Sequence, residues 1–224
     1  MIQALMHYKS HINLIEDEKT SIIIGTLLHL PTDLMLEVIF NAIGNKPDTL
    51  EEHLQKMPKF WPHWSPKGTS NSNYVEPDVF MRFSSFDLII EAKRNDDKTS
   101  QLSNQLKNEL IAYEKKYGKE KNIYIIALGG NRDDISKLNQ EERSRILPCS
   151  WKDLLYAIER KKGEVRTNKE DYADDVVYRI LSDCTDAFRV FGHMTGWLYE
   201  LCDLEYKPID KESIAKILDY GKCR

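Results

Sequence analysis

The sequence lacks the patterns that mark structural zinc sites and disulfide frameworks. Its histidines form no H-x-x-x-H or H-E-x-x-H arrangement, and none of its cysteines belongs to a C-x-x-C pair. Zinc ligation requires clustered thiolates or imidazoles, so a structural zinc site is not expected. We interpret the cysteines as separate, reduced thiols of a cytoplasmic protein; they are Cys149, Cys184, Cys202 and Cys223.

Long apolar runs and internal repeats are also absent. The apolar stretches Ile22–Ile24 and Tyr124–Leu128 are far too short to cross a bilayer. The first residues, MIQALMHYKSHINLIEDEK, do not combine a basic end, an apolar block and a small-residue cleavage site. We therefore expect a cytoplasmic location and no membrane partner.

The charge balance limits the possible partners without deciding among them. A net charge of −4 argues against a protein that coats nucleic acid along its whole surface. Between Lys93 and Lys121, eight Lys and Arg residues stand against five Asp and Glu residues. Such a local excess suffices for contacts with phosphates, but solvated helix faces often have the same balance.

Hydrophobic periodicity and turn residues predict helices, a hairpin, a helix and a strand, in that order. The expected helices at the start are Leu14–Leu30, Leu34–Ile43 and Thr49–Lys56, followed by an irregular segment, 57–73. The hairpin joins Tyr74–Phe83 to Phe86–Lys93 through Ser84-Ser85. A helix over 99–117 and a buried strand, Asn122–Leu128, complete this half.

Past Pro148 the chain is expected to be helical. Helices are predicted over Trp151–Arg160, over Val177–Phe191, and after Thr195 and Asp210. The fold class is therefore α/β, with a small mixed β-sheet flanked by helices. We divide the chain into a core, 1–163, and a helical C-terminal extension, 164–224.

The segment YVEPDVFMRFSSFDLIIEAKRNDD carries the candidate chemistry. Glu91 and Lys93 are two apart on one strand and therefore project from the same face. Ile89 shares that face, and pairing within the hairpin brings Asp78 beside Glu91. Two neighbouring carboxylates repel each other, and a hard divalent cation relieves the repulsion. The main-chain carbonyl of Ala92 is a further expected ligand, and Lys93 is expected to orient or activate a water.

These residues also match a known signature. E-P-D, a spacer and I-I-E-A-K resemble the active-site motif of the PD-(D/E)XK nuclease superfamily, the fold of many restriction endonucleases. Pro77-Asp78 and Glu91-Ala92-Lys93 match its two halves, and the resemblance covers roughly residues 12–130. It implies a restriction endonuclease-like core over 1–163, a Mg²⁺ or Mn²⁺ cofactor and a DNA substrate.

The resemblance also implies supporting residues outside the motif. An acidic residue of the first helix often joins the metal site, and Glu16 is the first choice here over Asp17, Glu18 and Glu37. These acids equally suit the N-terminus of a helix through its dipole, so both interpretations stay open. The stretch around Glu16 is similar to nuclease-fold proteins from phage-defence and mobile-element settings.

The helix after the motif carries Gln101 and Gln105, four residues apart on one face. The superfamily often places a glutamine there, beside the active site or the nucleic-acid backbone. Solubilisation of the helix flank is the other interpretation. Position 109 is Glu, so the Q-x-x-x-Y pattern of one exonuclease branch is missing.

Two further features have competing explanations. Trp61, His63 and Trp64 either pack against the core or stack on bases. The turn beginning at Gly129-Gly130 lacks the lysine and spacing of a P-loop and is interpreted as a simple turn.

The sequence thus predicts a Mg²⁺- or Mn²⁺-dependent deoxyribonuclease. Asp78, Glu91, Ala92 and Glu16 would hold the metal, Lys93 would assist the water, and Gln105 would support the site. The alternative is a catalytically silent nuclease fold that serves as a DNA-binding or protein-interaction module. A homodimer is among the partners that the resemblance allows.

Overall fold

The computed structural model describes residues 15–44, 52–96, 102–130, 138–167, 172–193 and 195. Their strands form one five-stranded sheet in the order β1-β2-β3-β4-β5. The strands are β1 (Lys56–Phe60), β2 (Val79–Arg82), β3 (Phe86–Ala92), β4 (Asn122–Leu128) and β5 (Ile146–Cys149). β2 is antiparallel to both of its neighbours, β1 and β3, whereas β3, β4 and β5 are parallel. The predicted α/β class with a mixed sheet is therefore confirmed.

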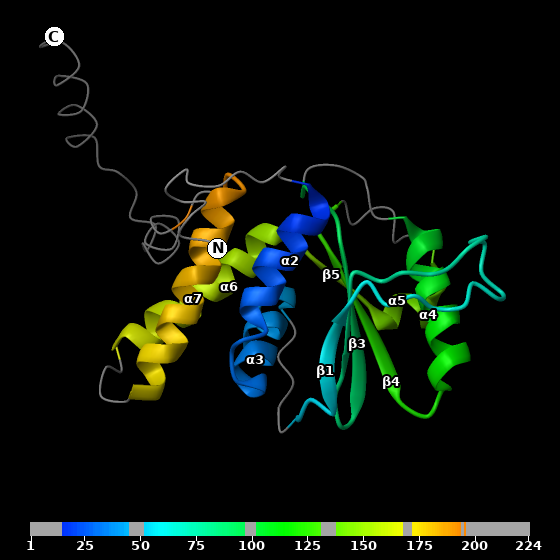
Figure 1. Ribbon diagram of the computed structural model, residues 1–224, viewed down its shortest axis with the longest axis horizontal. Coiled ribbons are helices and arrows are strands. Elements are labelled where there is room, and N and C mark those ends of the chain that lie inside the picture. Colours follow the sequence, from blue (N-terminus) through cyan, green and yellow to red (C-terminus); the bar gives the residue numbers. More distant parts are fainter. Residues whose placement is uncertain are drawn as a thin grey trace, which may run out of the picture.

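Helices cover both faces of the sheet. On one side lie α2 (Glu16–Leu27), α3 (Thr32–Ile43), α6 (Trp151–Thr167) and α7 (Tyr172–Val190), and on the other α4 (Ser103–Tyr117) with the short α5 (Gln140–Arg145) (Figure 1). The predicted break after the first helix is confirmed, because Pro31 precedes α3. Helix α3 ends at Ile43, and its capping residue Gly44 adopts a positive φ of 74°.

Strand β3 is buried along its whole length and separates two apolar cores. Leu88, Ile90 and Ala92 pack toward α3, α6 and α7. Ile89 faces the other way, toward Leu106 and other residues of α4. This alternation follows from the two-residue period of a strand and confirms the predicted faces. Glu91 therefore lies on the α4 side of the sheet.

Two strands were not predicted from the sequence, and both lie at the edges of the sheet. The predicted helix Thr49–Lys56 is wrong for its described part: residues 52–55 are not helical, and Lys56 begins β1. β1 contains Pro58 and lies largely in the segment 57–73 that was predicted to be irregular, and β5 contains Pro148 and was assigned no element. Proline lacks an N–H donor but is tolerated at an edge, where one side of the strand needs no partner.

Other boundaries moved by several residues. The strand predicted from Tyr74 is regular only over Val79–Arg82, with an isolated bridge between Trp64 and Val75 before it. The predicted division after residue 163 falls inside α6, and α7 contributes Leu181 and Phe188 to the core that it shares with α3. Gln101 and the helices predicted after Thr195 and Asp210 lie outside the described residues. Within those residues, no helix is long and apolar enough to cross a membrane.

Candidate active site

The hairpin brings the two motif carboxylates together. Val79 pairs with Ile90, so the same antiparallel register places Asp78 opposite Glu91. The Ala92 N–H donates a hydrogen bond of 2.8 Å to Asp78 Oδ2. The two-residue turn at Ser84-Ser85 is closed by a hydrogen bond from the Phe83 N–H to the Phe86 carbonyl. The predicted proximity of Asp78 and Glu91 is thus a consequence of hairpin register.

Lys93 completes the motif from the same face of β3. Its Nζ lies 2.5 Å from Glu91 Oε1 and 3.7 Å from Glu16 Oε1. The Lys93 N–H donates to the Leu128 carbonyl at 2.7 Å, which continues the parallel pairing with β4. The Lys93 side chain is only 12% exposed, so its ammonium is held among carboxylates with little access to water.

Helix α4 contributes two further polar side chains. Gln105 Nε2 donates to Glu91 Oε1 at 2.5 Å, so the predicted glutamine does reach the motif. Glu109, one turn later, is 1% exposed, and its carboxylate lies beside Glu91. Burial, and then the charge of Glu91, raise the pKa of Glu109 well above its ordinary value. The uncharged form of Glu109 is therefore favoured in the folded protein.

Glu109 was missed as a site residue, although the sequence contains a signal for it. The residue follows Gln105 by four positions and lies next to the apolar stripe that includes Leu106 and Leu110. A carboxylate beside such a stripe is buried when the helix packs on the sheet, and burial without a charged or hydrogen-bonding partner is unfavourable. Glu91 on β3 provides that partner only after the fold has formed.

The first helix supplies the predicted acid at the rim of the site. Glu16 Oε2 accepts a 2.7 Å hydrogen bond from the Arg94 N–H, and Glu16 Oε1 faces Lys93. Asp17 is exposed, Glu37 is bound to Lys161 at 2.9 Å, and one carboxylate oxygen of Glu18 is buried without a hydrogen-bond partner among the described residues. Among the candidate acids, Glu16 is therefore the one with contacts to the end of β3, and its role as a metal ligand stays a prediction.

The electrostatics of the group are dominated by burial. Desolvation, and then the nearby charge of Glu91, raise the pKa of Asp78 to about 7. Desolvation also raises the pKa of Glu91, although Lys93 opposes the shift. Burial disfavours the charge of Lys93, but the carboxylates of Glu91, Glu16 and Asp78 together outweigh burial and raise the pKa of the ammonium. The carboxylates thus repel one another in a poorly hydrated site, where a divalent cation would be favourable.

The oxygen donors at this site suit a hard cation, although the side chains are not arranged as a complete set of ligands. In the described ranges, no three His, Cys, Asp or Glu side chains are arranged to hold a metal ion. One Glu91 oxygen is bound to Lys93, and one Asp78 oxygen accepts from Ala92. Two buried carboxylates with a main-chain carbonyl nearby match the oxygen chemistry of Mg²⁺ or Mn²⁺, which retain several waters.

The main chain at Lys93 is held by two residues that were not predicted to belong to the site. Trp151 Nε1 donates a 2.6 Å hydrogen bond to the Lys93 carbonyl. Gly129 has a φ of 74°, and a Cβ there would lie 2.5 Å from the same carbonyl oxygen. The Gly129-Gly130 turn is therefore more than a connection, because its lack of side chains allows the end of β3 to pass close by.

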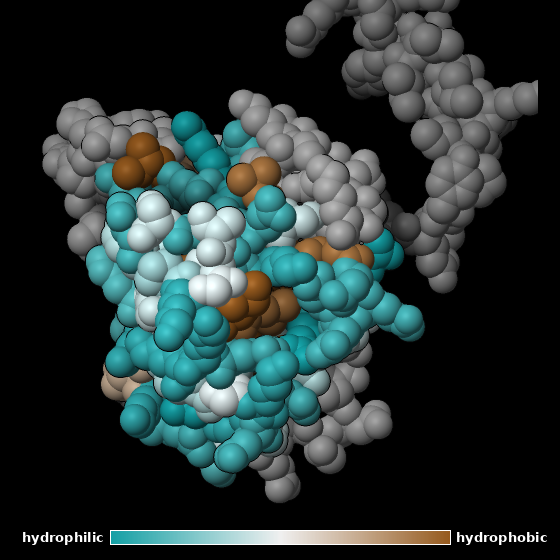
Figure 2. Space-filling view, turned by 90° about the vertical axis from the view of Figure 1, so that its right-hand side faces the viewer, coloured by the Kyte–Doolittle hydropathy of each residue, from teal (hydrophilic) through white to brown (hydrophobic). Residues whose placement is uncertain are grey.

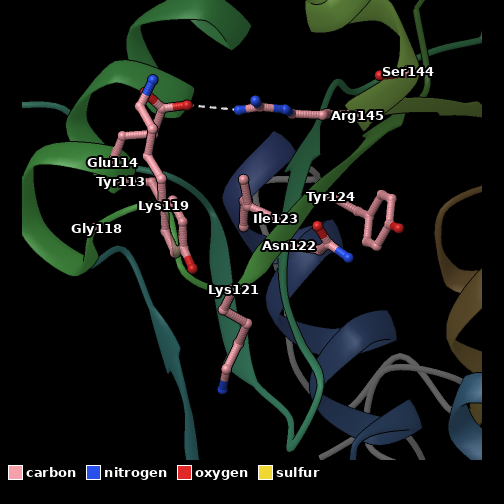
Figure 3. Close-up of a pocket in the computed structure, with 10 residues that line it drawn as sticks. All are labelled: Tyr113, Glu114, Gly118, Lys119, Lys121, Asn122, Ile123, Tyr124, Ser144 and Arg145. Atoms are coloured by element: carbon pink, nitrogen blue, oxygen red, sulfur yellow. Dashed lines mark hydrogen bonds and ion pairs between the residues drawn. The ribbon is translucent and has the colours of Figure 1, made fainter.

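The far end of α4 carries a second polar group, whose partners are all within the chain. Asp87, on the same face of β3 as Glu91, is fully buried; Arg82 Nε lies 3.0 Å away and the Tyr113 hydroxyl donates to it at 2.9 Å. A nearby pocket of about 290 Å³ is crossed by the ion pair between Arg145 and Glu114 (Figure 3). We interpret this group as structural.

Packing against the core explains one member of the aromatic trio. Trp64 is 2% exposed and packs against Phe80 in the core. His63 instead lies at the surface, stacked on Tyr74 with ring centroids 4.1 Å apart. Packing therefore accounts for Trp64 but not for the exposed His63.

Comparison with known proteins finds a similarity to an uncharacterized protein. It comes from Pasteurella multocida (strain Pm70) and is 29% identical over 181 residues, covering 77% of this chain and 68% of that protein. No family model matches the chain, and no solved structure matches it. The functional argument therefore depends on the geometry of the site.

Proposed function

We propose that this chain is a Mg²⁺- or Mn²⁺-dependent deoxyribonuclease of the PD-(D/E)XK type. The observation that carries the proposal is the convergence of Asp78, Glu91 and Lys93 at one end of the β2–β3 hairpin. Burying two acids and an ammonium costs desolvation free energy that a purely structural role would not require. The location also agrees with the tendency of α/β proteins to place sites at the carboxyl ends of parallel strands.

Each residue has a role that its contacts support. Asp78 and Glu91 would hold the cation, with the Ala92 carbonyl and Glu16 as further ligands. A bound divalent cation supplies Lewis-acid polarisation of the phosphate and lowers the pKa of the attacking water. Lys93 would orient that water and offset charge that develops on the phosphate. Gln105 fixes the orientation of the Glu91 carboxylate.

The test compares Lys93→Met with Lys161→Met. Both lysines are poorly exposed and bind a glutamate, at 2.5 Å for Lys93 and 2.9 Å for Lys161. Supercoiled plasmid and linear single-stranded DNA are incubated with the full chain and Mg²⁺ or Mn²⁺, with EDTA as the blank. We expect Lys93→Met to reduce cleavage by roughly a hundredfold or more, whereas Lys161→Met cleaves like the wild type.

Two outcomes would contradict the proposal. One is cleavage by Lys93→Met at the wild-type rate. The other is an unmodified protein that binds DNA but cleaves neither substrate with either metal, which would favour the silent DNA-binding module instead. A role in phage defence or on a mobile element belongs to the proposal only through the resemblance of the stretch around Glu16.

A further inference from the structure

A pocket of about 370 Å³ adjoins the carboxylate group on the α4 side. One wall comes from the segment that precedes β2, and the other from the beginning of α4. Gln105 and Glu109 line it; Gln105 hydrogen-bonds to Glu91, and the Glu109 carboxylate lies beside Glu91. A ligand in this pocket would therefore lie one side chain away from the motif.

The wall that precedes β2 is fastened to α4 by amide side chains. The Asn108 amide donates to Asn71 Oδ1 and to Ser70 Oγ, each at 2.8 Å. The Ser70 N–H donates back to Asn108 Oδ1 at 3.2 Å, and Asn71 Nδ2 donates to the Tyr74 carbonyl at 2.9 Å. These contacts hold the wall in place without any ligand, so the pocket is formed in advance.

Tyr74 presents an aromatic surface to this pocket. Its side chain is 43% exposed, and His63 stacks on it with an interplanar angle of 14°. His63 is in turn paired with Glu76. An exposed large aromatic ring whose position is fixed by its neighbours is the usual platform for stacking a base.

The charge of the pocket argues against a phosphate. Among the described residues that line it, none is Lys or Arg, whereas two, Glu76 and Glu109, are acidic. The other polar side chains are the hydroxyls of Ser70 and Tyr74 and four amides, among them the exposed Asn104 side chain. The face of the molecule that carries α4 is mostly hydrophilic (Figure 2), which fits a polar ligand better than an apolar protein surface.

We propose that this pocket binds one unpaired nucleobase of the substrate, next to the phosphate that is cleaved. Tyr74 would stack on the base, and Asn104 and Gln105 would hydrogen-bond to its edge, as amide side chains do with bases elsewhere. Entry requires a base that is free of its duplex partner, so the pocket would favour single-stranded or locally opened DNA. The inference rests on the proposed function for its substrate, but its test does not require cleavage.

The test measures binding in EDTA, where cleavage cannot interfere. Fluorescence anisotropy compares a labelled single-stranded oligothymidine with an abasic oligonucleotide of the same length, which has the same phosphates. The variants are Tyr74→Ala and Tyr74→Phe. Tyr156→Ala is the matched control, because Tyr156 is 39% exposed and lies on α6, on the opposite side of the sheet.

We expect the wild type to prefer oligothymidine over the abasic strand by roughly five- to a hundredfold, the range for one stacked base. Tyr74→Ala should lose that preference, while Tyr74→Phe and Tyr156→Ala should retain it. Equal affinity of the wild type for both strands, or a preference unchanged in Tyr74→Ala, would overturn the inference.

Its failure can be told apart from failure of the proposed function. Cleavage of DNA with no base preference removes only the pocket. A base preference lost in Tyr74→Ala, in a protein that cleaves no DNA with Mg²⁺ or Mn²⁺, supports the pocket and removes the nuclease. A wild type that neither binds nor cleaves DNA contradicts both.

Discussion

Replacing Asp78 by Asn should stabilise the metal-free protein at neutral and alkaline pH. The Asp78 side chain is buried, and its pKa is raised from 3.8 to about 7, mainly by desolvation and then by Glu91. The folded protein therefore holds a proton on Asp78 between about pH 4 and pH 7 that the unfolded chain has released. Stability contributed by that proton is present at low pH and is lost as the pH rises through about 7.

The size of the effect follows from the shift. Each pKa unit corresponds to about 1.4 kcal/mol, so Asp78 alone can lower the free energy of unfolding by up to about 4 kcal/mol between pH 4 and pH 8. Asn resembles the protonated acid, and its carbonyl can still accept the Ala92 N–H. We expect a gain of about 1 to 4 kcal/mol at pH 8, and a smaller gain at pH 5.

Denaturant unfolding in EDTA at pH 5 and pH 8 measures these values. Asp87→Asn is the matched control, because Asp87 lies in the same hairpin and is also buried, but it is bound to Arg82 and lies 3.4 Å from Lys121. That variant should lose roughly 3 kcal/mol or more. If Asp78→Asn is instead destabilised equally at both pH values, the Asp78 carboxylate is not repelled as described.

Three further predictions concern the metal and the main chain at the site. Mn²⁺ at a hundred times its Kd should stabilise the wild type by about 2.7 kcal/mol and thereby raise its melting temperature, and EDTA should reverse the rise. The same rise in Glu91→Gln would exclude Glu91 as a ligand. Gly129→Ala should lose both stability and cleavage, because its Cβ would meet the Lys93 carbonyl. Gly44→Ala, at a left-handed φ of 74° with open space around the Cβ, should lose only roughly 1 kcal/mol from backbone strain. Equal losses in denaturant unfolding would refute the steric argument. Trp151→Phe removes the donor to the Lys93 carbonyl and should lose about 1 to 3 kcal/mol in unfolding experiments, and an unchanged free energy would show that this hydrogen bond is dispensable.

The elements that the sequence predicted well are those with a strong local signal. The hairpin was identified because two apolar strands flank a two-residue turn, and its register then fixed the neighbours of Asp78. Strand β4 and helix α4 were identified from an apolar run and a helical stripe. The edge strands β1 and β5 were missed because their pairing is with distant residues and each contains a proline.

The candidate site divides in the same way. The order of residues along the hairpin determined by itself that Glu91 and Lys93 share a face, because side chains alternate along any strand. Only the packing of α4 on the sheet could bring Glu109 and Gln105 to Glu91. Likewise, only the approach of the end of β3 to the end of β4 and the start of α6 could place Gly129 and Trp151 at the Lys93 carbonyl. Contacts of the first kind follow from local geometry, whereas the second kind depend on which elements the hydrophobic cores bring together.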